Sequence, residues 1–335
     1  MTDLSQLLAC PRCDKSPLEL SNETYRCNAC KIDFPSIDGI PWMFAEPQAA
    51  LGEWRGRLQF AVQKLSYEIE GLKQELKNKE LSALARRRVE RYTKCVESHR
   101  RKLQKLLRPL DVQALQGSFE TYLALRTRLP SDQGLNTYYA NIHRDWAWGD
   151  AENLASLKQI EAVLQENSDL GNVLVLGAGA GRLAYDIHTR FDCTATVAMD
   201  FNPLLMLVAK KVTSGEKLKM YEFPIAPLAL EDDAVLRSLS APHVVEDGFH
   251  LWSERFDRQF TDIFAIEDEI VATFIPTDPP SVRLERGDSL EIGVASPSGS
   301  GTRHDADFGV FFRIQGDDAQ VAWPQGNEFS RTMRK

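Results

Sequence analysis

Glycine occupies every second position of one short loop: Gly177, Gly179 and Gly181. Four apolar residues precede the loop at 173–176, and a second apolar run, 197–199, ends on Asp200. Glycines let a backbone turn tightly and approach a ligand closely, because no Cβ stands in the way. An acid at the end of the next strand can accept hydrogen bonds from both hydroxyls of a ribose. The pattern predicts a nucleotide-type cofactor at the carboxyl ends of parallel strands.

Two further residues join the cofactor-binding candidates. Arg182 begins the helix expected after the loop, where it could hold a carboxylate of the cofactor or pair with Asp186 one turn further on. Asn202 follows the strand-end acid and is included with it. A dinucleotide fingerprint would place its third glycine at position 182. A nicotinamide or flavin enzyme, and a glycine turn without a ligand, stay open as alternatives.

Four of the six cysteines form two C-x-x-C pairs separated by 13 residues: Cys10, Cys13, Cys27 and Cys30. Each pair can present two thiolates to one metal, which predicts a tetrahedral zinc site. With all four positions filled by cysteine, no place is left for a reactive water, so the zinc would be structural. Disulfides and an iron–sulfur centre are the alternatives. Cys95 and Cys193 are isolated and are expected to be ordinary thiols.

The glycine loop resembles the first motifs of class I S-adenosylmethionine methyltransferases. The H-R-D-W segment at 143–146, followed by V-L-V-L-G-A-G-A-G-R-L-A-Y, resembles the carnosine N-methyltransferase family, as does F-P-I-A-P-L at 223–228. This resemblance covers about residues 135–250. It implies S-adenosyl-L-methionine as cofactor and N-methylation of a small imidazole or peptide-like acceptor. Past Phe256 the chain departs from the family.

An amine or imidazole must lose a proton when it is methylated, so a basic side chain nearby assists the reaction. The segment 137–149 is dense in aromatic and polar residues that can contact a ligand. Its candidates for catalysis are His143, Asp145 and Tyr139. His143 could equally be an ordinary core or surface histidine.

The N-terminus resembles the small zinc-ribbon proteins that activate tRNA and protein methyltransferases. The resemblance rests on the two C-x-x-C pairs and on the I-D-G-I-P sequence at 37–41. Next, apolar residues repeat in steps of four and three from Leu58 to Leu76, which predicts a helical seam that could support self-association. A bend near 78–79 favours a helical hairpin over one long helix.

These elements predict an α/β fold with a Rossmann-like class I methyltransferase sheet and a β-rich C-terminus. Strands are expected near 290–294, 308–314 and 319–323, a further one at 270–275, and a flexible loop at 296–301. D-P-P-S at 278–281 is either an ordinary Pro-rich turn, or it resembles the acid-Pro-Pro-aromatic loop that holds the target amine in methyltransferases acting on nucleobases, with Ser in place of the aromatic residue. The expected domains are a zinc ribbon (1–45), a helical hairpin (51–108), a helical lid (110–170), a cofactor-binding domain (171–260) and a β-rich segment (261–335).

The charge of the chain is unevenly spread. The whole chain carries −8, whereas residues 51–108 hold 16 Lys and Arg against 7 Glu, a net of +9. This segment could bind RNA or another polyanion, although a solvated helix surface is the simpler interpretation. No apolar run has the length of a membrane span and the first residues lack signal-peptide features, so we expect a cytoplasmic protein without membrane contacts.

Three functions follow as hypotheses. The first is a small-molecule N-methyltransferase. The second is an RNA or protein methyltransferase that docks through the ribbon and the basic helices. The third is a non-catalytic zinc-ribbon scaffold with a degenerate methyltransferase domain, because the C-terminal part lacks the family's features.

Overall fold

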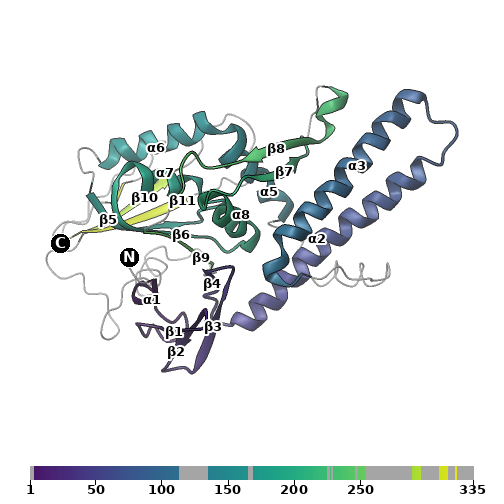
Figure 1. Cartoon of the computed structure of the whole chain (residues 1–335). Coiled ribbons are helices and arrows are strands. Elements are labelled where there is room, and N and C mark those ends of the chain that lie inside the picture. The colour runs from purple at the N-terminus through teal and green to yellow at the C-terminus, as the bar shows by residue number, and fades with distance from the viewer. Residues whose placement is uncertain are drawn as a thin grey trace.

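The structure is a computed structural model in which a small ribbon, a long helical hairpin and an α/β domain follow one another along the chain (Figure 1). It describes residues 4–112, 135–164, 169–224, 227, 229–245, 248–253, 289–295, 309–315 and 321–322. The predicted strand at 270–275, the D-P-P-S segment, the loop at 296–301 and much of the expected lid lie outside these residues. No helix in the described part has both the length and the apolar character that a membrane crossing requires.

The ribbon is a small curled antiparallel sheet. A short helix, α1 (Leu4–Leu7), precedes four strands that are hydrogen-bonded in sequence order. Their bounds are β1 (Glu19–Ser21), β2 (Thr24–Cys27), β3 (Ile32–Ile37) and β4 (Ile40–Pro41). The turns at Asp14, Asn22 and Lys31 have positive φ, as tight knuckles and hairpins require.

The apolar core of the ribbon continues into the central sheet. Leu8, Leu18 and Phe34 are buried in one cluster with side chains from two strands of that sheet: Leu174, Leu176, Val197 and Met199. The backbone joins as well, because Met43 N–H donates to the Ser253 carbonyl at 2.9 Å. The ribbon therefore covers one face of the sheet and has no separate core of its own (Figure 1).

The predicted hairpin is confirmed. Its helices are α2 (Pro47–Glu75) and α3 (Ala83–Leu106), and a short helix, η1 (Arg108–Leu110), follows. Ser82 caps α3 by accepting a hydrogen bond from Ala85 N–H at 3.2 Å. The seam residues Leu58, Val62 and Ile69 are buried within the chain. The alternative of one continuous helix is wrong.

The α/β domain is built on a six-stranded sheet in the order β12-β10-β11-β5-β6-β9. Three neighbouring strands of it are parallel: β5 (Asp169–Leu176), β6 (Asp192–Met199) and β9 (Phe249–Trp252). The predicted C-terminal strands are present as β10 (Ser289–Ala295), β11 (Gly309–Gln315) and β12 (Val321–Ala322). Strand β11 pairs antiparallel with β5, so the C-terminal strands continue the sheet on the side of β5 that lies away from β6.

Helices cover the face of the sheet opposite the ribbon. Val173 and Val175 of β5 belong to the large core that these helices share, whereas their neighbours Leu174 and Leu176 face the ribbon, because side chains alternate along a strand. The remaining elements are α5 (Leu135–His143), a π-helical turn η2 (Arg144–Trp148), α6 (Asp150–Leu164), α7 (Arg182–Arg190), α8 (Pro203–Thr213), the antiparallel pair β7 (Leu218–Glu222) and β8 (Val235–Leu239), and η3 (Leu230–Asp233).

Candidate functional sites

The four predicted metal ligands converge at one end of the ribbon. Their sulfur atoms all lie within 4.8 Å of one another. The Cys10 and Cys30 sulfurs are 3.8 Å apart, and those of Cys13 and Cys27 are 3.6 Å apart. Zinc–sulfur bonds of about 2.3 Å in a tetrahedron place the sulfurs about 3.8 Å apart, so the cluster fits a single zinc ion.

Two matching turns shape this cluster. Asp14 N–H donates to the Cys10 carbonyl at 2.9 Å, and Lys31 N–H donates to the Cys27 carbonyl at 2.8 Å. Burial raises the pKa of the Cys27 thiol, but the Cys30 backbone N–H and the neighbouring thiols lower that pKa by more. All four cysteines are free, which argues against the disulfide alternative. Four sulfur ligands suit zinc or an iron–sulfur centre.

The glycine loop lies at the carboxyl end of β5, where it turns into α7. Gly177, Gly179 and Gly181 all have positive φ, a conformation that glycine adopts without strain. At Gly181 an added Cβ would stand 3.0 Å from Ala209 Cβ of α8, so this position also needs glycine for helix packing. Space is more open at Gly179, where the nearest atom to an added Cβ is an Asp145 oxygen at 3.7 Å.

Asp200 lies at the end of β6, next to the loop, as predicted. Its buried carboxylate accepts hydrogen bonds from Gly179 N–H at 2.9 Å and from Asn202 N–H at 2.7 Å. Asn202 caps α8 through its Oδ1 atom, which accepts from Leu204 N–H at 3.1 Å. Its Nδ2 atom is buried and has no hydrogen-bond partner among the described residues. An unpaired buried donor at this edge suits a polar ligand.

The H-R-D-W segment contacts the glycine loop directly. Asp145 accepts a hydrogen bond from Ala180 N–H at 3.3 Å, and the Trp146 indole donates to the Ala180 carbonyl at 2.8 Å. Arg144 holds the other Asp145 oxygen at 3.0 Å. The π-helical turn η2 thus clamps the loop, and it places Asp145 beside Gly179 and Ala180.

Two contacts were expected for Arg182, either a cofactor carboxylate or Asp186, and the structure has the one with Asp186. Its guanidinium pairs with Asp186 one turn on, and with Asp150, at 2.9 Å each. It also donates to the Asp145 carbonyl at 2.8 Å, and it lies 5.5 Å from the Trp146 ring centroid. Arg182 therefore fastens η2 and α6 to the loop.

His143 is fully buried beside Tyr139. Its Nε2 atom lies 3.2 Å from the Tyr221 carbonyl oxygen, which can only accept, so Nε2 carries the proton. The Nδ1 atom is left as a proton acceptor with no partner among the described residues. Burial lowers the pKa of His143, although the Glu222 charge raises it in part. The imidazole is therefore neutral near pH 7 and able to accept a proton at Nδ1.

The protonation of Tyr139 differs from that of His143. Its hydroxyl donates to the same Tyr221 carbonyl at 2.8 Å, and burial raises the pKa of the phenol. It therefore stays protonated. On its other side lies His99 of α3, with ring centroids 5.3 Å apart.

Sequence reasoning missed His99, which completes this buried cluster. It follows Val96 by three residues and precedes Leu103 by four, so it occupies an apolar position of α3. A histidine at an otherwise apolar position of a helical repeat is the sequence feature that would have identified His99. Burial and the nearby His143 lower the pKa of His99 to about 4.

The low pKa of His99 predicts a pH dependence of stability. The folded histidine stays neutral between pH 6.5 and 4, while the unfolded chain takes up a proton, so stability is lost as the pH falls through this range. A shift of this size corresponds to about 3 kcal/mol. We expect His99→Gln to flatten the dependence in urea unfolding from pH 7.5 to 4.5. The exposed His243, changed to Gln, is the control, and an unchanged pH slope in His99→Gln would contradict the assignment.

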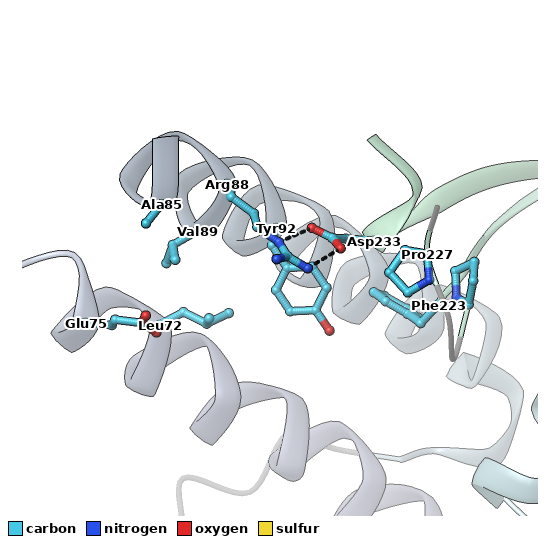
Figure 2. A pocket seen from close by; sticks show the side chains of 10 residues that line it. Leu72, Glu75, Ala85, Arg88, Val89, Tyr92, Phe223, Pro227 and Asp233 are labelled. Carbon is cyan, nitrogen blue, oxygen red and sulfur yellow. Dashed lines mark hydrogen bonds and ion pairs between the residues drawn. The ribbon is translucent and has the colours of Figure 1, made fainter. Parts of the chain in front are cut away.

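A pocket of about 470 Å³ opens between the tip of the hairpin and the segment that follows β7 (Figure 2). Arg88 spans it and forms two hydrogen bonds to Asp233, at 2.8 and 2.7 Å. The Phe223 ring contacts Tyr92 on the pocket wall and also His99, at centroid distances of 6.0 and 5.1 Å. The pocket and the buried histidine cluster thus share one aromatic wall.

A scan of protein-family models found no match to this chain, and a search of curated proteins found none either. What the geometry does establish is a cysteine cluster that can hold a metal and a parallel sheet with a clamped glycine loop at its carboxyl edge.

Proposed function

We propose that this chain is an S-adenosylmethionine-dependent methyltransferase that N-methylates a small imidazole or peptide-like acceptor, and that its ribbon holds a structural zinc ion. The observation that carries the proposal is the hydrogen bond from Ala180 N–H to Asp145. It joins the two segments that resemble the carnosine N-methyltransferase family, the H-R-D-W element and the glycine loop.

The residues at this edge fit a nucleotide cofactor. Gly177 is exposed and Gly179 is half-buried, so backbone of the loop is accessible to a ligand. The unpaired Asn202 amide offers a buried donor, and Asp200 offers carboxylate oxygens beside it. These four residues would hold the cofactor, on a Rossmann-like sheet. When bound, S-adenosylmethionine supplies an activated methyl group.

The chain's own part in the chemistry is to position the acceptor and to remove its proton. Of the three candidates, Tyr139 is kept protonated by burial and Asp145 is held by Arg144 and the loop. His143 is neutral, and its Nδ1 atom is without a partner among the described residues. We assign His143 as the base that accepts the acceptor's proton at Nδ1.

Cofactor binding is tested with a pair of glycine variants. We expect Gly179→Val to weaken S-adenosylhomocysteine binding by tenfold or more in calorimetry, because the valine side chain would occupy the space beside the loop backbone that the ligand needs. Gly171→Val is the matched control, since Gly171 has φ of 58° against 59° for Gly179 and open space around it. Both variants carry the same backbone strain. Equal affinity in the wild type and both variants would remove the glycine loop from the site.

A further inference from the structure

The outer face of α3 carries a row of exposed cations. Arg87, Lys94 and Arg101 are seven residues apart, which is close to two helical turns, so they fall on one line. Lys105 and Arg108 continue the row to the end of the hairpin, and all five side chains are exposed. At 1.5 Å per residue the row is about 30 Å long.

The charges in this row are not neutralised within the described part of the chain, where none of the five forms an ion pair. Three other charged residues of α3 form ion pairs. Arg88 and Arg91 contact Asp233, and Glu97 pairs with Lys73 of α2 at 3.0 Å. The second acid of α3, Glu90, lies between the first two members of the row. The row therefore retains a strong net positive charge.

The row is also held in place. The opposite face of α3 is buried through Val96, His99 and Leu103. The two hydrogen bonds from Arg88 to Asp233 tie the helix to the α/β domain. The hairpin extends from the body of the molecule (Figure 1), and the five side chains of the row are exposed. A rigid line of cations matches a partner whose negative charges also repeat along a line.

We propose that this row binds the phosphate backbone of double-helical RNA. An interfacial membrane helix needs a broad apolar face, and on α3 Leu84 is the large apolar side chain that is exposed. Single strands are bound with aromatic side chains that stack on bases, and the row has none. Helices in the DNA major groove gain from side chains that read base edges. A-form RNA is instead recognised mostly by its shape and by contacts to its phosphates and 2′-hydroxyls, which do not require base reading.

The test measures fluorescence anisotropy of a labelled 20-base-pair RNA duplex with the full chain and no cofactor, so the result does not depend on the proposed methyl transfer. Five phosphate contacts predict that affinity falls on the order of 10²–10³-fold between 50 and 200 mM salt. The triple variant Arg87→Glu/Lys94→Glu/Arg101→Glu should bind at least tenfold more weakly at 50 mM salt, and its salt slope should fall by about 3. The neutral Gln triple variant should show a smaller loss in the same direction.

The matched control reverses three exposed lysines outside the row, on α6 and at β7, Lys158→Glu/Lys217→Glu/Lys219→Glu, and changes the net charge equally. It should retain most of the RNA affinity. The proposal is overturned if the wild type does not bind the duplex, or if both triple variants lose affinity equally. It is also overturned if duplex DNA, single-stranded RNA or phosphatidylserine vesicles bind more tightly than duplex RNA.

Discussion

Replacing Cys27 with serine is expected to abolish zinc binding and to destabilise the α/β domain together with the ribbon. A structural zinc contributes on the order of 10–16 kcal/mol in small zinc modules, which is as large as the total stability of an ordinary domain. Without the metal the knuckles would open and uncover Leu174 and Leu176, which face the ribbon core. Metal analysis and the thermal midpoint of near-ultraviolet circular dichroism measure both effects.

The matched control for this variant is Cys95→Ser. Cys95 lies on α3, outside the four-cysteine cluster, so its loss should leave one zinc per chain and an unchanged midpoint. A full equivalent of zinc in Cys27→Ser would show that the four-cysteine assignment is wrong. If zinc is lost but the α/β domain melts at its normal midpoint, the ribbon is not needed to cover the sheet.

His143→Gln is expected to lower the rate of methyl transfer by about 10²–10⁴-fold, the usual contribution of a general base. Affinity for S-adenosylhomocysteine should stay unchanged, because His143 contacts Tyr221 and not the glycine loop in the interactions described above. Since burial lowers the pKa of His143, the wild-type rate should decline only below pH 6.5. Product formation with carnosine and other small imidazoles, measured from pH 5 to 8, checks both expectations.

His243→Gln controls for the loss of a histidine as such, because His243 is exposed. A wild-type rate in His143→Gln would remove His143 from the reaction. Wild-type protein that binds S-adenosylhomocysteine but methylates none of the small imidazoles would contradict the proposed acceptor while leaving the cofactor site intact. No binding at all would support the non-catalytic scaffold.

The features that follow from local sequence were predicted well. The C-x-x-C pairs, the apolar seam of the hairpin and the glycine loop between two apolar runs each depend on residues close together in the chain. The structure has the corresponding cysteine cluster, hairpin and parallel strands β5 and β6. Periodicity and turn chemistry suffice for such elements.

Contacts between distant segments could not be predicted in this way. The apolar residues of the ribbon gave no sign that Phe34 would pack in one core with Leu176 of the sheet. Nothing local indicated that His99 would lie beside Tyr139, forty residues away. No local pattern indicated that the Asp200 carboxylate would accept a hydrogen bond from Gly179 N–H, 21 residues earlier in the chain. Each of these depends on packing between elements, which a single-sequence pattern does not encode.

The pairing of β11 with β5 has a consequence for how the chain is made. Val310 is in register with Leu176, so one edge of β5 stays unpaired until a strand about 130 residues further along has been synthesised. At the ordinary rate of protein synthesis this delay is on the order of ten seconds. During that time β5 presents an unpaired apolar edge, which is a template for association with other chains. We expect the nascent chain to need protection by a holding chaperone until β11 has emerged from the ribosome.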